Sequence, residues 1–402
     1  MSRREDRAMP TAVPAVEPAS SSEPTVRPGP VPLPAPPVGR RRWLGVHAGQ
    51  VALWQTAALG AVAAGGPFDA VGGTATGLAA LVVAGTGVRV QGRWLPEWAL
   101  VRRRFRRRTR HALPVLPALA TRTHADRAGN RAGLTGDGRS WSALLRVDPT
   151  GDLDDLVRQL SAGYDDPDLP LSGLQLVDWT SPITGQAARW LAIRMDPEHA
   201  SRAVAARGGG PTGLVRATGT AALRIATELR AAGHQATLPD GTQLRDEWAV
   251  ALGVDPRRAD EASTEHWRYW SLGMLHQVCY RPRRSPRGWT EVGRLLRQHG
   301  QAPALVSAVS VRLDRQRGGG TRTRMLVRLG VPAGPTPEAV AEVVRQATAG
   351  FGGKLVPLHG AHAVAAWETL PLAGLRLPQP TRPIQPAQPD RPTQPSHART
   401  AP

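Results

Sequence analysis

Hydrophobic positions are unevenly distributed along the chain, and the longest apolar stretch lies near its start. Residues 43–88 contain one formally charged side chain, Asp69. Gly65-Gly66-Pro67 divides this stretch, because Gly and Pro are poorly tolerated inside a helix. The two resulting segments, 43–64 and 68–88, would each be about 32 to 33 Å long as α-helices, enough to cross a hydrocarbon core of roughly 30 Å. The pattern predicts a two-helix transmembrane hairpin.

Two other interpretations of this stretch remain open. Ala/Gly-rich helices of this kind also occur inside soluble domains. A cleaved signal peptide is disfavoured, because the apolar run begins only after residue 42 and a second run follows at once. Small residues recur four positions apart along the stretch, which favours close packing against other helices. These predicted helix-packing residues are Gly45, Gly49, Ala57, Ala61, Gly73 and Gly77.

A strongly basic segment, residues 93–110, follows the second apolar run. Its apolar residues recur at i, i+4, i+7 and i+11, so they share one face of a helix. Trp side chains favour the headgroup level and Arg favours anionic surfaces, so we predict an interfacial helix bound to an anionic lipid surface. A solvated continuation of the second span and a nucleic-acid arm are the alternatives. The predicted anchor residues are Trp94, Trp98, Arg102, Arg103, Arg104, Phe105, Arg106, Arg107 and Arg108.

The net charge of +19, from 51 basic and 32 acidic residues, is concentrated around the apolar stretch. Residues 89–131 hold 12 Arg against Glu97 and Asp126, whereas residues 132–375 hold 28 basic and 24 acidic side chains. The positive-inside rule then predicts a multi-pass protein of the cell (inner) membrane with both termini in the cytoplasm. The nearly balanced large domain argues against a nucleic-acid partner, which would need a basic footprint.

Residues 132–375 read as one cytoplasmic α/β domain with a mixed sheet, because short apolar runs alternate with amphipathic segments. Asp152 and Thr336 are the expected N-caps of two of its helices. The tails, 1–39 and 376–402, are Pro-rich and should be disordered. The predicted strands are 141–147, 174–179, 189–195, 304–313 and 324–331, and the predicted helices are 152–160, 213–232, 242–251, 289–298 and 337–349.

Candidate chemistry is sparse. Asp152-Leu-Asp154-Asp155 and Asp166-Pro-Asp168 could imitate the Asp-x-Asp of a metal-dependent glycosyltransferase, but the first sits at a helix start and the second in a Pro-rich turn. Gly350 to Lys354 lacks the spacing of a phosphate loop. His359 and His362 have no third ligand at zinc spacing. We therefore predict no catalytic residue, metal or cofactor.

The segment Thr264–Tyr280 holds His266, His276 and Cys279 among apolar and aromatic residues, which favours a core strand over a catalytic pair. Cys279 is the sole cysteine, so no intrachain disulfide can form, as suits a cytoplasmic domain.

The order of these features, with GRWLPEW leading into RRRFRRR, Gly136–Val147 (GDGRSWSALLRV) and Ser172–Trp179 (SGLQLVDW), resembles the EccE component of the actinobacterial type VII (ESX-type) secretion system. The resemblance covers roughly residues 40 to 370. It implies a non-catalytic structural subunit of the inner-membrane complex, assembled with components of the EccB, EccC and EccD type, in which the EccC ATPase supplies the energy. A membrane-anchored glycosyltransferase-like enzyme is the alternative function.

Overall fold

The computed structural model describes residues 48–64, 70–90, 93–109, 113–166, 168, 170–283, 304–317, 319–334, 342, 345–346 and 355–377. Several predicted features lie outside these residues. They are the tail 1–39, most of the tail 376–402, Gly45, the helix 289–298, the cap Thr336 and the Gly350–Lys354 turn. The helix predicted at 337–349 is described only at residues 342, 345 and 346, which are helical.

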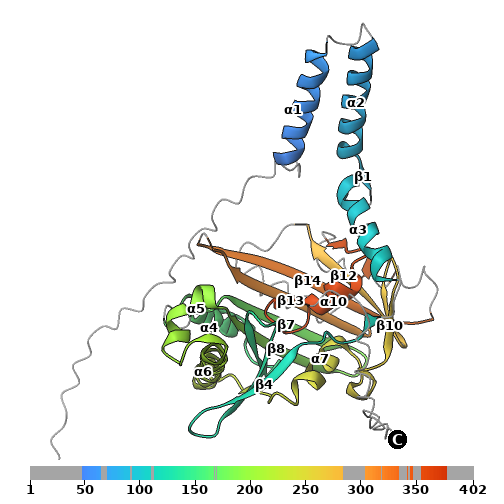
Figure 1. Cartoon of the computed structure of the whole chain (residues 1–402). Coiled ribbons are helices and arrows are strands. Elements are labelled where there is room, and N and C mark those ends of the chain that lie inside the picture. Colours follow the sequence, from blue (N-terminus) through green and yellow to red (C-terminus); the bar gives the residue numbers. More distant parts are fainter. Residues whose placement is uncertain are drawn as a thin grey trace, which may run out of the picture. The chain divides into compact units, whose positions relative to one another are not determined.

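Two apolar helices, α1 (Ala48–Ala63) and α2 (Ala70–Gly87), lie side by side at the start of the described chain (Figure 1). The Trp54 indole nitrogen on α1 donates a hydrogen bond to the Thr86 hydroxyl on α2 over 2.7 Å. Among the described helices α2 is the one long and apolar enough to cross a membrane, with 18 residues and a mean hydropathy of 1.4. Helix α1 is shorter, at 16 residues.

A short ribbon joins α2 to the basic helix α3 (Leu95–Arg108). It pairs β1 (Arg89–Val90) with β2 (Arg93–Trp94) in antiparallel fashion. The Leu95 amide also donates to the Val88 carbonyl over 2.9 Å. The end of α2 and the start of α3 are therefore tied by backbone hydrogen bonds.

The rest of the described chain is built on one sheet of thirteen described strands, with the order β3-β10-β11-β12-β14-β13-β7-β8-β6-β5-β4, β15 beside β12 and β9 beside β6. The strands are β3 (Leu113–Pro114), β4 (Ala120–Ala125), β5 (Arg131–Gly136), β6 (Trp141–Val147), β7 (Gly173–Ser181), β8 (Gln186–Met195), β9 (Ala236–Thr237), β10 (Ala262–Glu265), β11 (Trp270–Leu272), β12 (Leu275–Pro282), β13 (Val306–Arg315), β14 (Thr321–Pro332) and β15 (Leu355–Pro357).

Each described strand pair is antiparallel, whereas the sequence pattern predicted a mixed sheet. The reason is local connectivity: β4–β5, β5–β6, β7–β8 and β13–β14 are hairpins, and a short turn forces an antiparallel pair. The five predicted strands correspond to β6, β7, β8, β13 and β14. The segment Thr264–Tyr280, expected as one strand, instead contributes to β10, β11 and β12.

Helices cover both faces of the sheet, which explains why its strands read as nearly continuous apolar runs. Along β7, Leu174 and Leu176 face one core and Val177 and Trp179 the other. The first core includes residues of α4 (Leu153–Asp165), α5 (Pro197–Ala205) and α6 (Gly210–Ala231), and the second includes residues of α7 (Leu244–Leu252) and α10 (His362–Glu368). A 3-10 turn, η2 (Pro256–Arg258), follows α7. The predicted cap Asp152 is confirmed, because its side chain accepts from two amides of α4.

Arg328 on β14 is fully buried and closes the C-terminal end of α7. Its guanidinium donates to the Leu252 carbonyl over 3.1 Å and to the Ala251 carbonyl, both of which α7 leaves without intrahelical partners. It also donates to Gln277 Oε1 over 3.0 Å and to Thr369 Oγ1 over 2.9 Å. Burial lowers the pKa of Arg328 to about 10, so the group remains charged near neutral pH.

Replacing Arg328 by Met should lower the free energy of unfolding by about 2 to 4 kcal/mol, because buried carbonyl and amide oxygens would lose their donors. Urea denaturation of the full chain in detergent, followed by tryptophan fluorescence, measures this change. Arg322→Met is the matched control, since Arg322 lies on the same strand with an exposed side chain. An equal loss in both variants would contradict the role assigned to Arg328.

Candidate interaction site at helix α3

Helix α3 begins where the sequence favours a helix start and ends on positive charge. Pro96 lies in its first turn, where a missing amide hydrogen costs little. Glu97 lies in the same turn and Arg106, Arg107 and Arg108 in the last, which matches the helix dipole. The helix predicted at 93–110 is therefore present as residues 95–108.

Two aromatic side chains of α3 contact the ring of Trp267 on the α/β domain. This residue lies in the turn between β10 and β11. The Trp98 and Trp267 ring centroids are 6.1 Å apart at 71°, and those of Phe105 and Trp267 are 5.4 Å apart at 81°. The Arg102 guanidinium lies 5.1 Å from the Trp98 centroid and 5.6 Å from that of Trp267. Edge-on aromatic pairs contribute about 0.5 to 1.5 kcal/mol each beyond area burial.

The last turn of α3 is held by a buried ion pair. Arg108 lies 3.1 Å from Glu265 at the end of β10, and the Glu265 side chain is 0% exposed. Arg108 also donates to the Gly360 carbonyl over 2.6 Å, and the Ala363 amide donates to Glu265 over 3.1 Å. Removing one member of such a pair leaves an uncompensated buried charge, which is strongly destabilising.

Gly360 allows these groups to approach each other. Its φ of +70° is rare for residues with a side chain, and an added Cβ would lie 2.3 Å from the Trp267 ring. Its amide donates to the Trp267 carbonyl over 2.7 Å. Beside it, Arg93 donates to the His359 carbonyl over 2.9 Å. We call the group formed by Glu265, Trp267 and Gly360 the α3 socket.

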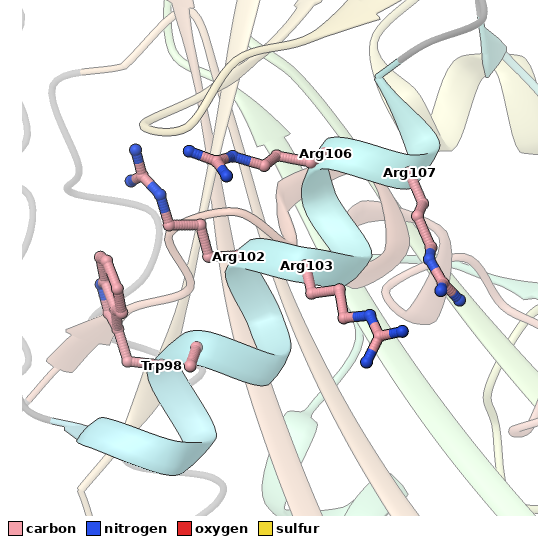
Figure 2. A pocket seen from close by; sticks show the side chains of 6 residues that line it. Trp98, Arg102, Arg103, Arg106 and Arg107 are labelled. Atoms are coloured by element: carbon pink, nitrogen blue, oxygen red, sulfur yellow. The ribbon is translucent and has the colours of Figure 1, made fainter. Parts of the chain in front are cut away.

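The remaining surface of α3 is basic and open. Figure 2 shows Trp98, Arg102 and Arg106 extending to one side of the helix, and Arg103 and Arg107 to the other. With Ala99 they line a shallow surface hollow. Arg103, Arg104, Arg106 and Arg107 are exposed, and none of them forms an ion pair with a carboxylate in the described part of the chain. The helix thus presents guanidinium groups that have no carboxylate partner among the described residues.

Four of the predicted helix-packing residues fall into two groups. Ala57 and Ala61 are half-buried and share a face of α1 with Trp54, which is bonded to α2. Gly73 and Gly77 are exposed on α2, and nothing lies within 4 Å of a Cβ built on Gly77. Gly49 lies in α1. Trp94, a predicted anchor residue, ends β2 and is partly buried.

The histidine and cysteine residues near the α3 socket form a structural cluster. The Cys279 amide donates to His362 Nδ1 over 3.1 Å, and both side chains are buried. Burial, with a smaller contribution from His359 and Arg93, lowers the pKa of His362 to about 3, so this imidazole is neutral. Burial raises the pKa of the Cys279 thiol to about 12. Among the described residues no three His, Cys, Asp or Glu side chains are placed to hold a metal ion.

Sequence reasoning missed the α3 socket. Trp267 was included in a predicted core strand, and Glu265 and Gly360 were not singled out. The available signal was that Trp267 stands between His266 and Arg268, a polar setting that suits a turn better than a strand interior.

Residues 183–281 match a protein family described as "Putative type VII ESX secretion system translocon, EccE". The matched segment runs from the β7–β8 turn to β12 and includes both Glu265 and Trp267. Over these residues, about a quarter of the chain, the protein is similar to a family of type VII secretion translocon components. The EccE assignment made from the sequence is confirmed by this match. A comparison with curated proteins gave no match.

Replacing Trp267 by Ala should release α3 from the domain, because two aromatic pairs and one cation–π contact are lost. We expect trypsin to cleave after Arg102 to Arg108 about ten- to thirtyfold faster, as for a loss of roughly 1.5 to 2 kcal/mol. Mass spectrometry of a digestion time course measures the rates. Trp267→Phe keeps an aromatic ring and should cleave more slowly than Trp267→Ala. Cleavage after Arg139 reports whether the domain stays folded, and unchanged cleavage of α3 would contradict the socket.

Proposed function

We propose that the protein is a non-catalytic structural subunit of the inner-membrane type VII secretion complex. The observation that carries this proposal is the exposed apolar helix α2, which is tied by backbone hydrogen bonds to the basic helix α3. An apolar helix ending in a dense cluster of arginines is the arrangement expected where a span leaves the membrane on the cytoplasmic side. The EccE family match supports the same assignment.

In this proposal, residues 43–64 and 68–88 form a transmembrane hairpin with both termini in the cytoplasm. Arg40, Arg41 and Arg42 precede the first segment and α3 follows the second, so positive charge flanks both outer ends. The mutual packing of α1 and α2, with the Trp54–Thr86 hydrogen bond, supports a hairpin over two independent spans. A polar bond between helices is favourable where no water competes for it.

Partner helices would pack on the small-residue face of α2. Ala57 and Ala61 belong to the α1 face nearest α2, which leaves Gly73 and Gly77 for contacts with other chains. Membrane helices associate by close packing at such positions, since the lipid gives no hydrophobic driving force. The partners proposed from the family resemblance are membrane components of the EccB, EccC and EccD type. The α/β domain would brace these components on the cytoplasmic side.

Helix α3 would bind an anionic lipid surface through its exposed arginines, Arg103, Arg104, Arg106 and Arg107. Because Trp98 and Phe105 pack on Trp267, the arginines rather than the aromatic residues would carry this contact. The alternative, a glycosyltransferase-like enzyme, has no observation in its favour among the described residues, since the Asp152 carboxylate accepts hydrogen bonds from its own helix.

Replacing Gly73 and Gly77 by Leu should reduce co-purification of the other translocon components about fivefold or more, because packing of this kind contributes roughly 1 to 2 kcal/mol. Quantitative mass spectrometry of the complex purified in mild detergent measures the ratio. Gly60→Leu is the matched control, since Gly60 on α1 also has nothing within 4 Å of its built Cβ. Unchanged co-purification of the double variant would contradict the packing face.

Replacing Arg103, Arg106 and Arg107 by Gln should weaken the retention of phosphatidylglycerol relative to phosphatidylcholine, because each Arg near an anionic surface contributes about 1 kcal/mol. Native mass spectrometry of the full chain counts the retained lipids. The control triple variant changes Arg127, Arg139 and Arg202, which are exposed and carry the same total charge. Equal lipid retention by the two triple variants would contradict the anchor.

A further inference from the structure

The end of the α/β domain that holds α3 carries three further arginines. Arg268 follows Trp267 in the β10–β11 turn, and Arg281 and Arg283 lie at the end of β12 and just beyond it. All three side chains are exposed, and none forms an ion pair with a carboxylate in the described residues. They come from the sheet rather than from the basic segment that the sequence pattern singled out.

The structure ties these arginines to the junction with α3. Arg93, which donates to the His359 carbonyl, has a pKa lowered by burial and by the charge of Arg281. Burial, Arg93 and Arg268 in turn lower the pKa of His359. Arg268 is joined by a peptide bond to Trp267, whose ring contacts α3. Arg281 therefore lies within electrostatic range of Arg93 on β2, and Arg268 lies within range of His359, whose carbonyl accepts from Arg93.

Such a group of like charges is costly unless an anion compensates it. Some exposed arginines elsewhere on the domain have carboxylate partners, as in the Arg146–Glu247 and Arg224–Asp166 pairs. At the α3 junction Glu97 is the one acidic residue of the helix, and Glu265 is already paired with Arg108. Guanidinium groups bind phosphate oxygens through paired hydrogen bonds, so phosphate-bearing surfaces suit this end of the domain.

We propose that Arg268, Arg281 and Arg283 bind the headgroups of anionic phospholipids, so that this end of the sheet lies against the membrane surface beside α3. The proposal rests on the proposed insertion of α2 in the membrane. We identify the bound group as lipid because the Val88–Leu95 hydrogen bond keeps α3, and the domain end beside it, next to the end of the proposed membrane span. Lipid headgroups are then the phosphate groups nearest to these side chains.

The test maps the reactivity of individual arginines toward phenylglyoxal in the full chain. The protein is reconstituted in nanodiscs of phosphatidylcholine with or without phosphatidylglycerol, and modified residues are quantified by mass spectrometry. We expect Arg268, Arg281 and Arg283 to react about fivefold more slowly with the anionic lipid, and added salt to remove this protection. Arg127, Arg139 and Arg202 should react equally in both lipids.

Two further arms separate the possible outcomes. Inorganic phosphate added to the phosphatidylcholine nanodiscs should not protect the three arginines, and equal protection by free phosphate would overturn the lipid assignment. R268Q/R281Q/R283Q should speed the modification of Arg103 and Arg107 in anionic nanodiscs, whereas the R127Q/R139Q/R202Q control should not. Protection confined to α3 would overturn this inference and leave the α3 anchor intact. Absence of protection at both sets would contradict the anchor as well.

Discussion

The packing of Trp267 between Trp98, Phe105 and Arg102 is the interaction on which the placement of α3 depends. An amphipathic helix with Trp and Phe on one face can bury that face in a lipid interface or in protein. Here that face contacts Trp267 of the domain and is half-buried, and the buried Arg108–Glu265 pair fixes the rotation of the helix by holding its last turn. Both contacts converge on Gly360, whose lack of a side chain lets the Trp267 ring and the Arg108 guanidinium approach the same turn.

Once the aromatic face is used in this way, Arg103, Arg104, Arg106 and Arg107 extend into solvent. They cannot turn inward without losing hydration, because a buried charge is tolerated only with a partner of the Glu265 kind. Remaining outside, they repel one another over distances shorter than the screening length of roughly 8 to 10 Å. The clustering of these arginines therefore carries an electrostatic cost at the α3 junction, and an anionic neighbour would relieve it.

Local patterns in the sequence were sufficient for the central strands and for α4. The run Trp141–Val147 coincides with β6, because both faces of that strand are buried and its ends are marked by a turn and by Asp148. Asp152 was identifiable because a capping carboxylate acts within one turn. The antiparallel sheet was less accessible, since strand pairing depends on which turns are tight. The division of residues 262–282 into three strands needed the tertiary position of Trp267, which periodicity does not supply.

Periodicity was equally limited for α3. The contacts of this helix also indicate one structural role of the family-matched segment. The i, i+4, i+7 spacing of Trp98 and its neighbours established that they share a face, but it contained no information on what covers that face. The covering residues Glu265 and Trp267 lie about 160 positions later, inside the matched range 183–281, while α3 lies outside it. Part of the matched segment therefore forms strands near one edge of the sheet and the surface that binds α3. Such a surface requires bulk, shape and one buried carboxylate rather than a set of reactive groups. Burial accordingly keeps the His362 imidazole neutral by lowering its pKa and keeps the Cys279 thiol protonated by raising its pKa.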